Sequence, residues 1–97
     1  MTDRYILEGK ISVPCPGLVT WAKWFETADR QVARETIGES EISTVFLGLD
    51  HQYSEGPPLL FETMVFGGKL ADEQDRYPTW DEALAGHKAM VERVKKK

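Results

Sequence analysis

The sequence has little cysteine, little histidine and little positive charge outside its C-terminal tail, and it contains no long apolar run. A single cysteine excludes an internal disulfide, which is typical of a protein in a reducing cytoplasm. No apolar stretch approaches the roughly 18–20 residues of a membrane-spanning helix, and the N-terminal residues lack the apolar stretch of a secretory signal. We therefore expect a cytoplasmic protein with no membrane partner.

The charges of the chain are unevenly distributed. The sequence contains 12 Lys or Arg and 16 Asp or Glu, but four of the basic residues lie in the last five positions. Residues 1–92 therefore carry eight basic and sixteen acidic side chains. A protein that binds nucleic acid needs a clustered basic surface to displace counterions, so this distribution argues against a nucleic-acid partner.

The chain is short for a protein that folds alone. Its 97 residues amount to a single domain, 1–97, and a chain of this length buries only about 60–65% of its unfolded surface. One modest core must stabilise the fold, which favours association with further copies. We therefore expect a homo-oligomer.

The first part of the chain predicts a strand followed by a helix. In residues 5–13, apolar side chains share one parity and polar side chains the other, which is the period of a β-strand. The segment 14–17 ends this strand with two prolines and a glycine. Apolar residues then recur at spacings of three and four, which predicts a helix of about 17 residues that Gly38 can stop. The helical stripe consists of Leu18, Trp21, Phe25, Ala28 and Val32.

Two further strands are predicted in the middle of the chain. Segments 42–49 and 59–66 are rich in branched and aromatic side chains, and the link between them suits an antiparallel hairpin with a long loop. Neither segment alternates cleanly, which predicts a sheet that is covered on both faces. Residues 67–78 combine two glycines with a run of acids and amides, which predicts a surface loop.

A second helix has the clearest signal in the sequence. Thr79 and Glu82 form a capping box, in which each side chain can bond a backbone amide at the helix start, and an apolar stripe continues to Val94. The predicted fold is therefore α+β in the order β-α-β-β-α. Its antiparallel sheet surrounds the central hairpin, and both helices pack on one face.

His87 lies in the middle of this second apolar stripe, beside Gly86. A neutral imidazole that is hydrogen-bonded inside the core explains such a position. A histidine directed into a pocket between helix and sheet explains it as well, because a polar residue in an apolar stripe needs a partner. Both interpretations stay open.

Three more side chains are candidate ligand contacts. Asp50 and His51 lie where a strand enters a long loop, a common position for binding residues, although a turn accounts for Asp50 equally well. Glu62 lies inside the segment 59–66, where a carboxylate must be paired or face water. One hypothesis places His87 in a pocket with Glu62 or Asp50, and the other gives each residue a structural role.

A surplus of aromatic residues favours a flat ligand. Trp24 lies at the edge of the first helical stripe, near Arg30, so that an indole and a guanidinium can hold a ring beside a phosphate. The sequence contains neither a CxxC motif nor two histidines four residues apart, and the segment 67–69 lacks the pattern of a P-loop. We expect no metal and no cofactor.

Four segments of the chain together carry a family resemblance: LVTWAKWFETADRQVA (18–33), STVFLGLDH (43–51), PPLLFETMVFGG (57–68) and RYPTWDEALAGH (76–87). They resemble a family of small accessory proteins from tailed bacteriophages, and the resemblance covers most of the chain. It implies the cytoplasm of an infected bacterium as the setting. It carries over no catalytic residue, because the family has no settled activity.

Three functions follow as hypotheses. The resemblance implies a protein that acts on host machinery or host defence, and we expect a homo-oligomer that sequesters a nucleotide-derived immune signal without catalysis. A small hydrolase or phosphodiesterase is the alternative, with a histidine as general acid or base and a carboxylate as its partner. A protein that blocks a host protein through its surface is the third. The predicted ligand-binding residues are Trp24, Arg30, Asp50, His51, Glu62 and His87.

Overall fold

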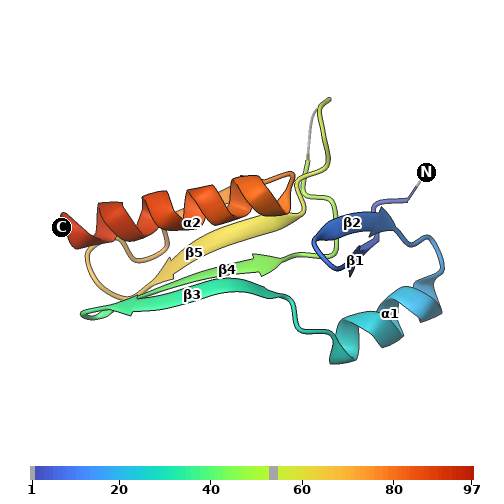
Figure 1. The fold of residues 1–97 in the computed structure, drawn as a ribbon, viewed down its shortest axis with the longest axis horizontal. Helices are drawn as coiled ribbons and strands as arrows, with labels where there is room; N and C mark the ends of the chain where they lie inside the picture. The colour runs from blue at the N-terminus through green and yellow to red at the C-terminus, as the bar shows by residue number, and fades with distance from the viewer. Residues whose placement is uncertain (1, 53–54) are drawn as a thin grey trace.

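The computed structural model describes residues 2–52 and 55–97. These residues form a two-stranded and a four-stranded antiparallel sheet together with two helices, so the predicted α+β class is confirmed. Figure 1 shows α2 lying along the four-stranded sheet, whereas α1 lies at the other end of the molecule beside β1 and β2. In chain order the elements are β1 (Tyr5–Glu8), β2 (Ile11–Pro14), α1 (Leu18–Thr27), β3 (Gln31–Ile37), β4 (Ser40–Phe46), β5 (Phe61–Phe66), β6 (Gln74–Tyr77) and α2 (Trp80–Lys95).

The predicted first strand is a hairpin. Glu8 pairs with Ile11, which leaves a two-residue turn in which Gly9 adopts a φ of 64°. This left-handed conformation suits glycine and the twist of a tight hairpin. Paired residues share a face of the hairpin, and successive residues of a strand alternate between its two faces. Ile11 therefore lies on the same face as its partner Glu8, and Tyr5 lies on the other face. Tyr5 packs against the core, whereas Ile11 is exposed.

The first helix is shorter than predicted and does not join α2 on one face. It ends at Thr27 with Ala28 as its C-cap, and Val32, the last member of the helical stripe, lies in the edge strand β3. The Asp29 carboxylate accepts a hydrogen bond from the backbone N–H of Gln31 at 3.0 Å, a local bond that competes with helical bonding. Pairing of β3 with β4 is a long-range interaction that the local stripe could not reveal.

The central hairpin is confirmed and extends into a meander of four strands. β4 pairs with β5, with Thr44 opposite Thr63 and Phe46 opposite Phe61. The segment 67–78, predicted as a surface loop, contains the short edge strand β6. Its polar side chains explain the wrong prediction, since a short, charged strand is a common way to protect a sheet edge.

The two faces of the four-stranded sheet differ, so the prediction that both are covered was wrong. Alternate residues of β4 and β5 are buried beneath α2, among them Ile42, Phe46 and Val65. The intervening residues, such as Ser43 and Glu62, are half-buried on the other face. That face mixes polar side chains with Val45, Met64 and Phe66, of which Phe66 is 49% exposed.

Candidate functional site

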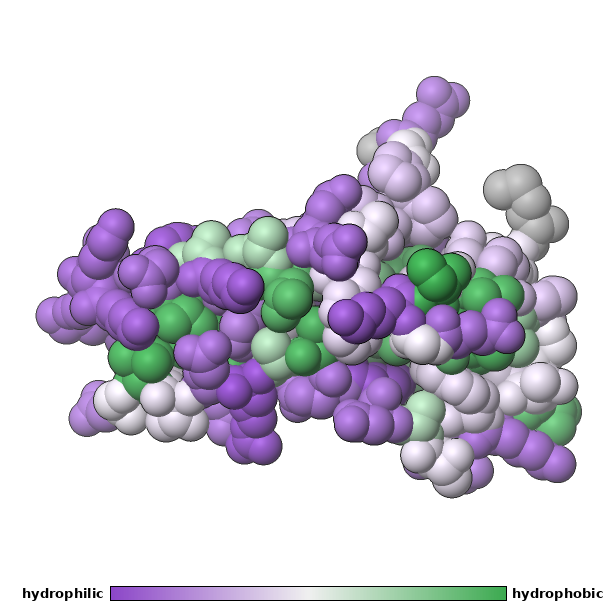
Figure 2. All heavy atoms as spheres, viewed as in Figure 1, coloured by the Kyte–Doolittle hydropathy of each residue, from purple (hydrophilic) through white to green (hydrophobic). Residues whose placement is uncertain are grey.

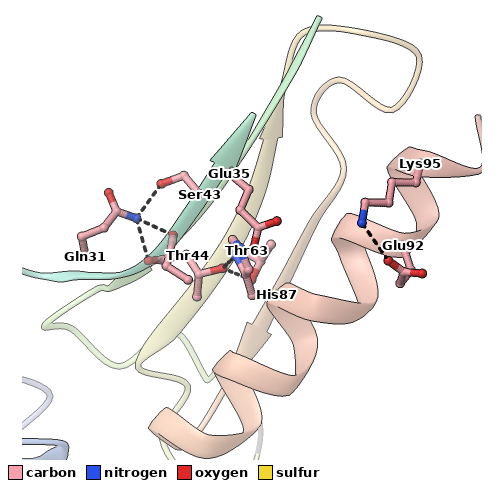
Figure 3. Close-up of polar contacts among 9 residues, drawn as sticks. Gln31, Glu35, Ser43, Thr44, Thr63, His87, Glu92 and Lys95 are labelled. Atoms are coloured by element: carbon pink, nitrogen blue, oxygen red, sulfur yellow. Dashed lines mark hydrogen bonds and ion pairs between the residues drawn. The ribbon is translucent and has the colours of Figure 1, made fainter. Parts of the chain in front are cut away.

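His87 is the most deeply buried of the predicted site residues, with an exposed fraction of 1%. Its Nδ1 lies 2.7 Å from Oγ1 of Thr44, and this hydroxyl also bonds the hydroxyl of Thr63. Figure 3 shows the three side chains meeting between α2 and the sheet. The hydroxyls satisfy one side of the imidazole inside the core, which favours the structural interpretation of His87.

The second ring nitrogen of His87 faces the edge strand β3. Its Nε2 lies 3.4 Å from Oε1 of Glu35 but has no hydrogen-bond partner among the described residues. The Glu35 side chain is about half exposed, so it touches both the core and water. His87 therefore contacts Thr44 and Glu35 and forms no common site with Asp50 or Glu62.

Tyr77 of β6 is half-buried and packs against α2 beside His87. Its ring fills the space beside Gly86, where a Cβ would lie less than 3.0 Å from ring atoms of the tyrosine. Burial raises the pKa of Tyr77 and so does the nearby Asp75 carboxylate, whereas a hydrogen bond with Thr63 and the charge of Arg93 lower it. The buried hydrogen bonds join His87 to Thr44 and Thr44 to Thr63, and the Tyr77 ring packs against α2 at Gly86.

Glu62 lies on the face of the sheet opposite α2. Its carboxylate accepts a hydrogen bond from Nε of Arg76 at 3.0 Å, and the two residues are register partners in β5 and β6. Both side chains are partly sheltered from water. This ion pair meets the requirement that a strand carboxylate be paired.

Asp50 and His51 lie within the loop between β4 and β5. The Asp50 carboxylate accepts hydrogen bonds from the backbone N–H groups of Gln52 and Leu59, at 2.8 and 3.0 Å. This arrangement is an Asx turn extended across the loop and favours the structural interpretation of Asp50. The backbone N–H of His51 donates to the carbonyl of Leu59, and a ligand contact through the His51 side chain stays a prediction.

Trp24 and Arg30 join α1 to the four-stranded sheet. Trp24 packs edge-on against Phe46, with ring centroids 5.7 Å apart. The Arg30 guanidinium lies 3.9 Å from the centroid of the Phe25 ring, and its Nη1 donates to the carbonyl of Phe46 at 2.9 Å. Both side chains contribute to packing here, and their role toward a ligand stays a prediction.

An unpredicted groove of about 390 Å³ lies between the β1–β2 hairpin and the start of α2. The Trp80 indole packs edge-on against Phe61, which holds it in place, and the ammonium of Lys10 lies 5.9 Å from the indole centroid. Figure 2 shows hydrophobic side chains exposed at the end of the molecule that carries β1 and β2. We call this cavity the aromatic groove; it is lined mainly by Tyr5, Lys10, Pro57, Pro58, Pro78 and Trp80.

The sequence gives no local signal for the aromatic groove. Tyr5 reads as one member of a strand pattern, and Trp80 as one member of a helical stripe. The groove exists because the hairpin, the loop before β5 and the start of α2 meet in the fold. The surplus of aromatic residues was the only indication of such a surface.

No metal centre is evident in the parts of the chain that the structure describes. Within 2–52 and 55–97, no three His, Cys, Asp or Glu side chains are grouped closely enough to hold a metal ion. Over the same residues, neither helix has the length and apolar character needed to cross a membrane.

No protein-family model, no curated protein and no solved structure matches the chain. The fold and the cavities of the chain itself therefore define its class: a small α+β protein with an aromatic groove at one end of its longer helix.

Proposed function

We propose that the protein binds a small ligand in the aromatic groove, and that this ligand combines a flat ring with a negative charge. A nucleotide-derived molecule has both features. The observation that carries the proposal is the position of the Lys10 ammonium above the Trp80 indole, within a groove whose other walls include Tyr5 and three prolines.

The dimensions and chemistry of the groove support this ligand class. Small-molecule pockets range from about 300 to 1,000 Å³ and are mostly apolar, with a few polar groups that orient the ligand. Here Trp80 and Tyr5 offer aromatic surface for a base, at about 1–3 kcal/mol per stacked base. Lys10 at the rim offers a charge for a phosphate.

The lining of the groove favours binding over turnover. General acid–base catalysis requires a titratable group beside the reacting atom, and a histidine paired with a carboxylate is the common arrangement. The described lining residues include neither an imidazole nor a carboxylate. The proposed function is therefore retention of the ligand, which is what a sequestering protein does.

The biological setting of this proposal follows from the sequence resemblance. Segments that span most of the chain resemble accessory proteins of tailed bacteriophages, which act inside an infected bacterium. We place the protein in the host cytoplasm, where it withholds a nucleotide-derived immune signal from its receptor. A small groove that holds an anionic nucleotide is compatible with this role.

The proposal includes a homodimer formed through α1. None of the ten residues of α1 is buried, and Leu18 and Val19 are 59% and 65% exposed. The accessible surface is 6123 Å², against about 5,600 Å² expected for a folded monomer of this mass. The radius of gyration is 14.1 Å, against about 12.5 Å for a compact domain of this length. A second copy of α1 offers a matching apolar surface.

The solution mass tests the dimer. Light scattering should give at least twice the 11.0 kDa of one chain. Val19→Glu should reduce this mass to that of a monomer, because a carboxylate at the interface is costly, whereas Thr20→Glu adds the same charge one residue further along α1 and is the control. A wild-type monomer at micromolar concentration refutes the dimer.

Ligand retention tests the groove. The protein is incubated with cyclic and adenosine-linked nucleotides, freed of unbound ligand and denatured, and the released molecules are identified. We expect intact nucleotide from the wild type and about tenfold less from Trp80→Leu and Lys10→Gln, a loss equivalent to about 1.4 kcal/mol. Trp24→Leu and Lys23→Gln are the matched controls.

Each contrary outcome has a distinct meaning. Chemically altered nucleotide identifies an enzyme and refutes sequestration. No retained nucleotide refutes the ligand class and favours a host protein as the target. Loss of retention in Trp24→Leu but not in Trp80→Leu refutes the aromatic groove and supports the site predicted from the sequence.

A further inference from the structure

A second cavity lies at the opposite end of α2 from the aromatic groove. Its volume is about 260 Å³, and it is enclosed by the β3–β4 turn, the glycine turn after β5 and the last turn of α2. Trp80 and Val94 line the two cavities, and a helix of that length separates them by about 20 Å. We call this cavity the lysine pocket; its polar lining includes Glu39, Ser40, Lys69, Lys95 and Lys97.

The charge of the lysine pocket contrasts with the rest of the chain. Three lysines and one glutamate are among its lining residues, although residues 1–92 as a whole carry twice as many acids as bases. Among the described residues, Lys69 and Lys97 have no ion-pair partner, and Lys95 lies 3.4 Å from the exposed carboxylate of Glu92. Such an exposed pair contributes little, so the pocket retains a positive charge.

The glycine turn supplies further hydrogen-bond donors. Gly67 and Gly68 have φ values of 78° and 76°, and a side chain at Gly68 would collide with Ser40. The Ser40 hydroxyl donates to the carbonyl of Gly67 at 3.0 Å, which ties the turn to β4. The backbone N–H groups of Gly68, Lys69 and Leu70 donate to no acceptor within 2–52 and 55–97. Consecutive unbonded amides in a turn are typical of anion-binding loops.

We propose that the lysine pocket binds a compact phosphate-type anion, such as the phosphate or pyrophosphate group of a small ligand. Three lysines from two segments of the chain provide the charge, and the backbone N–H groups of Gly68, Lys69 and Leu70, which also line the cavity, have no acceptor among the described residues. The acidic body of the protein would repel an extended polyanion, so the occupant is a small phosphate compound. This site is separate from the aromatic groove and does not depend on the function proposed for it.

Titration with inorganic pyrophosphate tests the proposal. Pyrophosphate has no ring, so stacking in the aromatic groove cannot account for its binding. We expect saturable binding to one site at an ionic strength of about 0.01 M, where screening is weak. Backbone amide resonances of Gly68, Lys69 and Leu70 should shift with the same binding curve.

A pair of variants with the same net charge isolates the pocket. Lys69→Gln combined with Lys95→Gln and Lys97→Gln should weaken pyrophosphate binding by about tenfold or more. Lys23→Gln combined with Lys88→Gln and Lys96→Gln removes the same charge outside the pocket and should change it by less than about threefold. All six lysines are exposed, so both variants should fold, which circular dichroism verifies.

Three results overturn the proposal. One is the absence of saturable pyrophosphate binding. Another is equal weakening in the two variants, which indicates general electrostatics. The third is tight binding of a short duplex DNA without binding of pyrophosphate, which assigns the lysines to nucleic acid.

Discussion

Replacing Gly86 with alanine should destabilise this protein, although the same change inside a helix usually stabilises it. Gly86 lies within α2, where glycine costs about 1 kcal/mol relative to alanine. Its missing side chain, however, makes room for Tyr77: a Cβ would come under 3.0 Å from the Cζ, Oη and Cε1 atoms of the ring. The two effects oppose each other, and the geometry decides which one dominates.

The clash should outweigh the gain in helix propensity. The Tyr77 ring packs against the core cluster that contains Phe61 and Ala83, so it cannot move aside without losing these contacts. Extra atoms in a tightly packed interior cost about 1–3 kcal/mol. After the gain of about 1 kcal/mol from propensity, we expect Gly86→Ala to lower the free energy of unfolding by up to about 2 kcal/mol.

Urea denaturation of a double-mutant cycle measures the two terms separately. In the background of Tyr77→Ala, the space beside the helix is open, and Gly86→Ala should then raise the free energy of unfolding by about 1 kcal/mol. Ala85→Gly, at the exposed neighbouring position, should cost about 1 kcal/mol in either background. If Gly86→Ala stabilises the protein that retains Tyr77, the reasoning is refuted.

Three further predictions concern the packing of α2. His87→Leu should change the free energy of unfolding by less than about 1 kcal/mol in urea denaturation. It removes the stabilising bond to Thr44, and it also removes a buried nitrogen whose lack of a hydrogen-bond partner is costly. Loss of folding would instead show that the imidazole is required. Because burial raises the pKa of Tyr77 above 10.0, the unfolded chain loses this proton first, and stability should fall as pH rises above 10.0. Tyr77→Phe should reduce that slope, and an identical pH profile would contradict the assignment. Thr79→Ala should lower the free energy of unfolding by about 1 kcal/mol in thermal unfolding, because the N–H of Glu82 loses its acceptor. Thr79→Ser keeps a hydroxyl and should cost less. Equal losses in the two variants would argue against the cap.

Local signals predicted the second helix well. Thr79 accepts a hydrogen bond from the N–H of Glu82 at 3.2 Å, which is one of the two bonds of the predicted capping box. The reciprocal bond, from the N–H of Thr79 to the Glu82 carboxylate, is absent among the described residues. The predicted stripe members His87 and Val94 are both buried against the sheet. Capping and a stripe of period 3.6 depend on neighbours within a few residues, and both can therefore be read from the sequence.

The β3 strand could not be predicted in the same way. Val32 fits the helical stripe that begins at Leu18, and it also fits a strand. The strand with which it pairs, β4, follows only after the turn at Gly38. No feature of the neighbouring sequence shows whether a helix or a strand is more stable here in the folded protein. The bond from the N–H of Gln31 to the carboxylate of Asp29 follows the end of the helix at Thr27, but aspartate is too common in helices to predict this.

The candidate sites depended even more on distant contacts. The predicted residues proved to lie apart: His87 under α2, Glu62 on the opposite face and Asp50 in a turn. Each satisfies a local requirement for burial, pairing or turn formation. The aromatic groove instead brings Trp80 next to Lys10, and a contact between residues so far apart in sequence follows only from the fold.

One measurement tests the aromatic groove most directly: titration with adenosine monophosphate, followed through the indole N–H resonances of the three tryptophans. Trp80 lines the groove, whereas Trp24 packs against Phe46 and the indole of Trp21 donates to backbone carbonyls. We predict a saturable shift of the Trp80 resonance that Lys10→Gln weakens, with little change at Trp24 and Trp21. A shift confined to Trp24, or no saturable shift of any indole, would contradict the proposed site.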